Sequence, residues 1–300
     1  MFRYNPASDQ LAGVGDAVVA AVSTGITVDT TGKYLYVTLG NNSVAMFLIN
    51  HDSLTYVNAV GTDANPSDVT ISPDGRFIYV PNRTANTIGI YSRNPSDGSL
   101  TATGSAAPGT GPVSIAFDPT GQFAFVPNFG TNNVSAFTVN RTTGALTNNG
   151  TVATGTGPNH LLVHSTGRFA YACNNATNNV SVMLINSSTG TLTANGAIAA
   201  GTTPSRMAFD YSGNTLYVAN AASNNISIYS IDPTTGALTA IGSVAAGSSP
   251  RRLALNSAGL FVSSFGSNSL LQYAIGSNGA ISQKYDAGTG SGPIGVAATQ

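Results

Sequence analysis

The chain has 300 residues, of which 8% are charged, and its formal net charge is −1. Such sparse and balanced charge excludes a nucleic-acid-binding protein, which needs a dense face of Lys and Arg to displace counterions. No apolar run approaches the roughly 20 residues that cross a bilayer, so we expect no membrane span. One cysteine excludes a disulfide within the chain, and we expect Cys173 to be a small buried residue.

The chain is built from a repeat of nearly constant length. A Pro, an alternating apolar run and a Gly recur, with successive Pro residues 46 positions apart and each Gly nine positions after its Pro. The pairs are Pro66/Gly75, Pro112/Gly121, Pro158/Gly167, Pro204/Gly213 and Pro250/Gly259. Ser23/Gly32 begins the series, and Pro293 opens a shortened last copy. A period of roughly 40–50 residues made of short strands is typical of a β-propeller.

Residues 66–111 illustrate one repeat. Apolar and polar residues alternate along 66–72, as in a half-buried strand, and Pro73-Asp74-Gly75 favours a tight turn. Further strands are expected at 77–80, at 88–92 and from Leu100 onward. No segment carries a helical period, so the sequence predicts an all-β fold whose blades each have four antiparallel strands.

We predict that residues 1–300 form a single seven-bladed propeller domain. Its last blade takes a first strand from the C-terminus and its outer two strands from the N-terminus, so the terminal strands close the ring and one strand is lacking. The expected blades span about 22–65, 66–111, 112–157, 158–203, 204–249, 250–292, and 293–300 together with 1–21.

Two explanations for the lacking strand stay open. Either Met1 is an internal residue of a longer protein, whose upstream part also held an export signal, or a neighbouring chain donates the strand. The second explanation would give self-association through the incomplete blade.

The strand ends resemble those of lactonase-type seven-bladed propellers. The residues that carry this resemblance are Tyr79-Val80-Pro81-Asn82, Phe125-Val126-Pro127-Asn128, Tyr217-Val218-Ala219-Asn220 and the turn Ser72-Pro73-Asp74-Gly75. This group includes 6-phosphogluconolactonase-like proteins, carboxymuconate-lactonising cyclase-like proteins and YVTN-repeat proteins. The similarity covers essentially the whole chain.

One position in each first strand points to chemistry. The residue two places after each Pro is expected to line the central channel near one mouth; in order these residues are Gly25, Asp68, Ser114, His160, Arg206, Arg252 and Gly295. Arg251 adds a guanidinium beside Arg252. Two Arg side chains can grip a carboxylate or phosphate while His160 acts as general acid or base. Alternatively, an Arg here simply spans the channel to backbone carbonyls.

The resemblance implies roles for these residues. In the lactonase-like enzymes a channel His and Arg residues act on small anionic lactones, which makes His160 and Arg206 the candidate catalytic residues. Arg252, Arg251, Asp68 and Ser114 form the candidate substrate-binding set. The family's enzymes also carry a Glu after a second strand, but this chain contains no Glu. Asp68 is the nearby acid that could substitute.

Two functions are compatible with the sequence. The first is a lactonase-like hydrolase or lactonising isomerase that binds a small anionic lactone or carboxylate. The second is a non-catalytic scaffold, exported to the surface or periplasm, whose Asn- and Thr-rich rim meets other proteins or glycans. Whether the protein is an enzyme stays open at this point.

We expect no cofactor and no metal. A second polar ring includes Asp118, His164 and Asp210, which can be interpreted as a metal site, but Asp and Ser commonly cap turns at such positions. The Asn-rich loops between second and third strands, such as Asn128 to Asn133, either bind a sugar or supply residues that tolerate left-handed turns.

Overall fold

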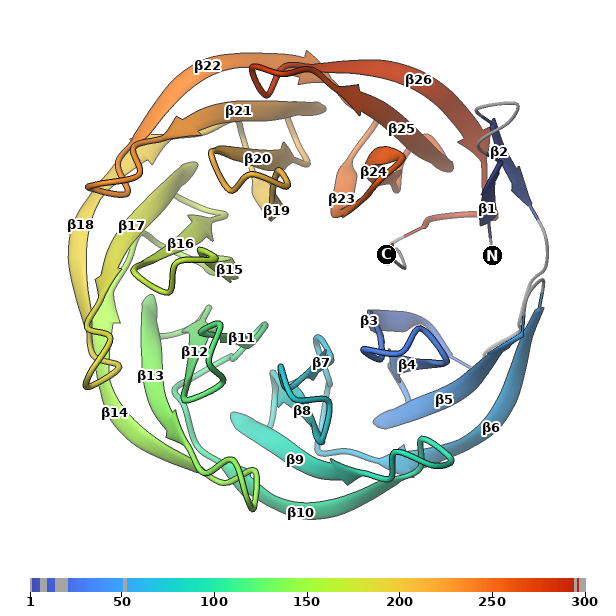
Figure 1. The fold of residues 1–300 in the computed structure, drawn as a ribbon, viewed down its shortest axis with the longest axis vertical. Helices are drawn as coiled ribbons and strands as arrows, with labels where there is room; N and C mark the ends of the chain where they lie inside the picture. The colour runs from blue at the N-terminus through green and yellow to red at the C-terminus, as the bar shows by residue number, and fades with distance from the viewer. Residues whose placement is uncertain (1, 6–9, 14–20, 51–52, 294–295, 297–300) are drawn as a thin grey trace.

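The computed structural model describes residues 2–5, 10–13, 21–50, 53–293 and 296. Six four-stranded sheets and one two-stranded sheet surround a central axis, and every strand pairing within them is antiparallel (Figure 1). No helix occurs in the described ranges, and hence no helical segment with the length and hydropathy of a membrane span. The predicted all-β propeller of four-stranded antiparallel blades is confirmed.

Each complete blade runs from the axis outward in chain order, as Figure 1 shows. The first strands, nearest the axis, are β3 (Ser23–Val28), β7 (Thr70–Ile71), β11 (Ala116–Phe117), β15 (Pro158–Val163), β19 (Pro204–Phe209) and β23 (Pro250–Asn256). The second strands are β4 (Tyr34–Leu39), β8 (Phe77–Asn82), β12 (Phe123–Asn128), β16 (Phe169–Asn174), β20 (Thr215–Asn220) and β24 (Gly259–Ser264).

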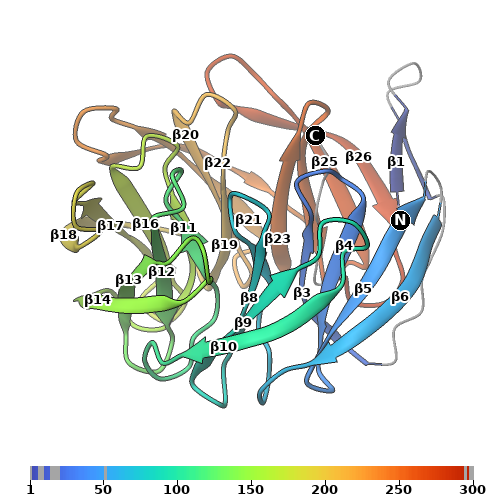
Figure 2. The ribbon, with the colours of Figure 1, turned by 60° about the horizontal axis from the view of Figure 1, so that its bottom comes forward.

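The outer half of each blade consists of a hairpin. The third strands are β5 (Ser43–Asn50), β9 (Thr87–Arg93), β13 (Asn133–Val139), β17 (Asn179–Ile185), β21 (Asn225–Ile231) and β25 (Ser269–Ile275). The fourth strands are β6 (Ser53–Gly61), β10 (Leu100–Ala106), β14 (Leu146–Ala153), β18 (Leu192–Ala199), β22 (Leu238–Ala245) and β26 (Ile281–Gly288). Figure 2 shows the ring tilted, with β8, β9 and β10 of the second blade toward the viewer.

The predicted count of seven blades needs correction, because the described residues contain six four-stranded blades. The seventh position holds only a hairpin of β1 (Phe2–Asn5) and β2 (Gln10–Gly13), and β2 contacts β26. A full blade also needs inner strands. The first strand, predicted at 293–300, lies almost entirely outside the described residues. The sequence analysis assigned no segment to the second strand.

Contacts between neighbouring blades form the core. Every residue of the second strand β16 is buried, and Phe169 and Tyr171 from this strand pack against Leu216 of the next blade. The Tyr171 hydroxyl also donates to the Gly236 carbonyl of that blade at 2.8 Å. The same bond joins three other pairs of adjacent blades, through Tyr36 and Gly98, Tyr79 and Gly144, and Tyr217 and Gly279.

The Asn-rich loops also link neighbouring blades. Asn132 adopts a left-handed conformation with φ of 54°, and its Oδ1 accepts the N–H of Gly157 at 2.9 Å. Gly157 directly precedes Pro158, so this bond fixes where the next first strand begins. Equivalent residues do the same in the other blades; they are Asn42, Asn86, Asn178, Asn224 and Asn268. These residues therefore have the turn-forming role, one of the two that the sequence left open.

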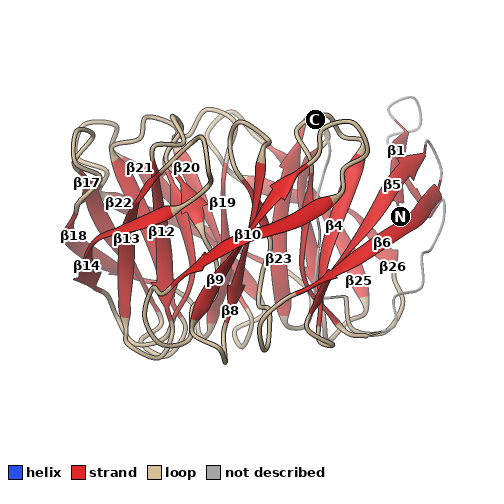
Figure 3. Ribbon diagram, turned by 90° about the horizontal axis from the view of Figure 1, so that it is seen from below, coloured by secondary structure: helices blue, strands red, loops and turns tan. Residues whose placement is uncertain are grey.

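An irregularity in each first strand positions the channel residues. In the fourth, fifth and sixth blades the pairing register shifts between the Pro and the residue two places later. In the second blade the strand predicted from Pro66 is interrupted: Pro66 makes an isolated bridge to Asn82, and regular pairing resumes only at Thr70. Such bulges re-aim a side chain, here toward the axis. Figure 3 shows the loops gathered at the two ends of the ring.

We predict a graded loss of stability at Asn132. Asn132→Gly removes the side-chain bond but keeps the left-handed turn, which should lower the free energy of unfolding by about 1 kcal/mol. Asn132→Ala keeps a Cβ in the left-handed region but lacks the polar side chain that makes this conformation accessible to Asn, which should cost about 1–2 kcal/mol more than Asn132→Gly. Urea unfolding of the three proteins tests this order. Equal losses in the two variants would show that backbone conformation plays no part.

Candidate functional site

Three charged side chains from three blades meet across the channel. Asp68 of the second blade accepts from Arg252 of the sixth blade, with 2.9 Å between Oδ1 and Nη2. It also accepts from Arg206 of the fifth blade, with 3.3 Å between Oδ2 and Nη2. The Asp68 side chain is 7% exposed, and the two Arg side chains are 13% and 12% exposed. The structure thus brings together residues separated by 138 and 184 positions.

Both guanidinium groups are also anchored to backbone. Arg206 Nη1 donates to the Asn159 carbonyl at 2.6 Å, and Arg252 Nη2 donates to the Thr24 carbonyl at 3.1 Å. The sequence analysis left open whether these Arg residues bind a ligand or only contact backbone carbonyls. Such backbone contacts are present, together with the ion pairs to Asp68. Because each Arg is fixed at two points, the cluster is ordered before any ligand arrives.

His160 of the fourth blade lies beside this cluster as a neutral hydrogen-bond donor. Its Nδ1 accepts the backbone N–H of Met207 at 3.2 Å, so the proton of the neutral ring resides on Nε2. Burial, followed by the positive charges of Arg206 and Arg252, holds the pKa of His160 well below its ordinary 6.5. Near neutral pH the ring therefore offers an Nε2–H donor.

The cluster has more donors and more positive charge than it uses. Two guanidinium groups and one carboxylate leave a net charge of +1. Burial and the Arg252 charge lower the pKa of Arg206 to about 10, so it stays protonated at neutral pH. Among the described residues, the buried Arg206 Nε and Ser114 Oγ have no hydrogen-bond partner. This arrangement favours an oxyanion as ligand.

Two of the residues expected at the channel are not part of the Arg206–Asp68–Arg252 cluster. Arg251 is exposed, and its guanidinium carbon lies 5.3 Å from the Phe265 ring centroid. Neighbouring residues of a strand point to opposite faces, which separates Arg251 from Arg252. Gly295 lies outside the described residues.

Gly25 has a role that the sequence analysis missed. A Cβ at this position would lie 2.6 Å from Asp68 Cα and 2.7 Å from Thr38 Oγ1. The Asp68 carboxylate thus occupies the space where a side chain of the first blade would stand. The sequence held one signal for this role: the channel position is polar or charged in the second to sixth repeats but is Gly in the first.

The second polar ring serves the turns and the contacts between blades. Asp118 and Asp210 accept backbone N–H groups of their own turns, and both His164 ring nitrogens are hydrogen-bonded. Asp29 forms a buried ion pair with Arg93 of the next blade. In the described part of the chain, no three His, Cys, Asp or Glu side chains are placed to hold a metal ion.

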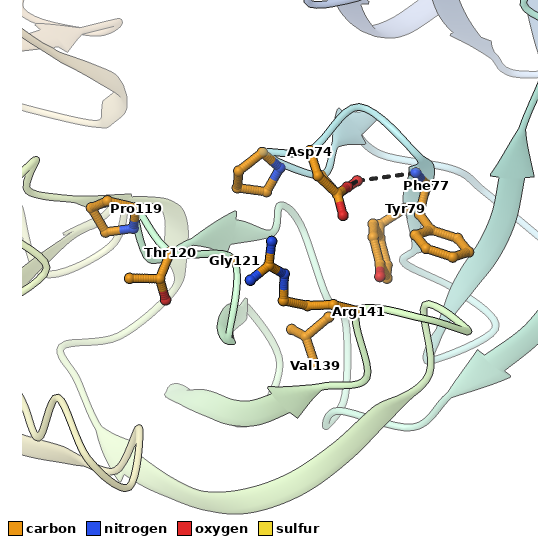
Figure 4. A pocket seen from close by; sticks show the side chains of 10 residues that line it. Asp74, Phe77, Tyr79, Pro119, Thr120, Gly121, Val139 and Arg141 are labelled. Atoms are coloured by element: carbon orange, nitrogen blue, oxygen red, sulfur yellow. Dashed lines mark hydrogen bonds between the residues drawn. The ribbon is translucent and has the colours of Figure 1, made fainter. Parts of the chain in front are cut away.

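A surface pocket lies elsewhere, between the second and third blades at the other end of the sheets. Its lining includes Asp74, Tyr79, Pro119 and Arg141, and Figure 4 shows the Arg141 guanidinium directed into it. Asp74 is already paired with Arg76 at 2.9 Å. This pocket is separate from the channel cluster.

We predict a pH-dependent stability contribution from His160. Because the pKa of His160 in the folded protein lies below 6.5, the folded state favours the neutral ring. The stability that His160 contributes is therefore fully present above pH 6.5 and is lost as the pH falls toward the pKa of the folded state. Between about pH 6.5 and 5.5 the wild type should therefore lose about 1 kcal/mol of unfolding free energy more than His160→Gln loses. Urea unfolding across this range gives the comparison, and parallel losses in the two proteins would refute the prediction.

We predict that Gly25→Ala disturbs the cluster through contact alone. The new Cβ meets backbone, so Asp68 must move, at a cost of about 1–3 kcal/mol in stability. The matched control is Gly61→Ala, where a Cβ meets nothing within 4 Å. A crystal structure of Gly25→Ala should show a lengthened Asp68–Arg252 distance. Stabilities that match in the two variants would contradict this packing argument.

The chain matches the model of the family described as lactonase, 7-bladed beta-propeller, over residues 12–117 and 114–283. No curated protein matches it in sequence.

Several solved structures are similar over nearly all of both chains. A Bacteroides fragilis protein assigned as a 6-phosphogluconolactonase is 24% identical, with a TM-score of 0.86, covering 98% of this chain and 91% of that one. The periplasmic gluconolactonase of Pseudomonas aeruginosa is 20% identical, with a TM-score of 0.86 and coverages of 97% and 92%. These likenesses establish the fold, and the family match extends over most of the repeats. The chain therefore belongs to the lactonase family of seven-bladed β-propellers.

Proposed function

We propose that the protein is a lactonase-like hydrolase that binds a small anionic lactone at the channel mouth and opens it. The observation that supports this most is the Arg206–Asp68–Arg252 cluster with its net positive charge and the adjacent His160 donor. An anionic group of the substrate is attracted by the two guanidinium groups, which are fixed in place before binding.

In the proposed reaction, water attacks the lactone carbonyl carbon while a carboxylate takes its proton. Asp68 is the carboxylate of the cluster and fills that role. The carbonyl oxygen becomes an oxyanion, which the His160 Nε2–H stabilises. Cleavage of the ring C–O bond then yields an alkoxide, which recovers the proton and leaves a hydroxy acid. In this scheme His160 is an electrophilic donor, whereas the sequence suggested a general acid or base.

A panel of sugar lactones and small anionic lactones, with and without phosphate, tests the proposal. For any lactone that the wild type opens, His160→Ala and Arg206→Ala should each lower kcat/KM by about 100-fold or more, as loss of an oxyanion donor does. Arg168→Ala is the matched control, since its exposed guanidinium donates to backbone carbonyls at the far end of the ring and lies over the Phe169 ring there.

Two outcomes would oppose this function. If the folded wild type opens no lactone of the panel, the non-catalytic scaffold becomes the better description. If Arg168→Ala loses as much activity as Arg206→Ala, the channel cluster is not the reacting site.

We also propose that the protein is exported. The sparse charge supports export, as does the periplasmic location named for the similar Pseudomonas protein.

A further inference from the structure

We propose that Ser114, His160 and Arg206 form a seat for a single carboxylate, and that Asp68 tunes this seat for singly charged groups. The inference rests on the proposed function, because the seat would hold the lactone carbonyl first and the carboxylate of the hydroxy acid afterward. It adds the identity of the recognised group and a residue, Ser114, whose contribution is separate from the ion pairs.

The donors of this seat come from three successive blades. Ser114, His160 and Arg206 occupy the same position in the third, fourth and fifth repeats, and their first strands are neighbours in the ring (Figure 1). Ser114 is 2% exposed, and its Oγ has no hydrogen-bond partner in the described residues; the same holds for Arg206 Nε. Leaving buried donors unpaired costs free energy, which a ligand oxygen would recover.

The His160 donor completes the set. Met207 engages Nδ1, so the free hydrogen of the ring is on Nε2, on the side away from that backbone contact. Three N–H or O–H donors, with Ser114 Oγ as the one atom among them that can also accept, favour an oxyanion as ligand. A cation or a neutral amine would find only Ser114 Oγ as an acceptor among these three groups.

The charge balance selects the ligand. With Asp68 in place the cluster carries +1, so one bound carboxylate makes it neutral. A doubly charged sulfate or phosphate would leave −1 in a buried site, which is unfavourable. Substitution of Asp68 by Asn would raise the cluster charge to +2 and remove this preference.

The test measures binding without turnover. Acetate, sulfate and the neutral isostere acetamide are titrated into the full-length protein at matched ionic strength by calorimetry, with the Tm followed in parallel. We expect saturable acetate binding, and weaker binding of both sulfate and acetamide. Ser114→Ala should weaken acetate about tenfold, as expected for a bond to a charged group, without lowering the Tm of the free protein.

Two further variants separate charge from geometry. Arg206→Lys keeps the charge but removes the Nε donor, and it should also weaken acetate by about tenfold. Asp68→Asn should shift the preference from acetate toward sulfate. The matched control is Ser67→Ala: Ser67 Oγ donates to the Pro81 and Pro112 carbonyls, so its loss should lower the Tm and leave acetate affinity unchanged.

The inference is overturned if acetate does not bind, if sulfate binds the wild type as tightly as acetate, or if Ser114→Ala and Ser67→Ala have equal affinities. If acetate binds as expected but no lactone is opened, the carboxylate seat is supported and the hydrolase proposal is refuted. If a lactone is opened but acetate does not bind, the hydrolase proposal is supported and the carboxylate seat is refuted.

Discussion

The structure depends on hydrogen bonds and packing between neighbouring blades. A single four-stranded sheet cannot bury its own faces, so each blade needs a blade on either side. Buried tyrosine hydroxyls and the left-handed Asn residues repeat the same inter-blade bonds around the ring. Because these bonds recur at equivalent positions, the first strands are held at similar depth, and side chains at one position of the repeat converge on the axis.

The candidate site forms because the converging side chains differ from blade to blade. Most features of the ring repeat from blade to blade, but the channel position changes from Gly to Asp, Ser, His and Arg. The side chains complement each other across the axis: Gly25 leaves room for Asp68, and Asp68 receives an Arg from each of two other blades. A regular scaffold therefore supports one irregular, charged centre.

Membership in the family does not by itself assign the chemistry, since one fold carries many functions. The absence of Glu leaves Asp68 as the carboxylate of the cluster. The hydrogen bond from Met207 places the His160 proton on Nε2 and thereby favours stabilisation of charge over proton abstraction. The side chains of this chain itself therefore support the proposed lactonase activity, and the similar proteins supply the context.

The sequence alone determined the strand order of the complete blades and the ring position of Asp68, His160, Arg206 and Arg252, because both follow from a periodic pattern of local preferences. It could not give the pairing of Asp68 with the two Arg residues, the proton position on His160 or the unpaired donors of Ser114 and Arg206. Nor could it decide the number of complete blades. These features depend on distances between segments far apart in the chain, which only the closed tertiary structure sets.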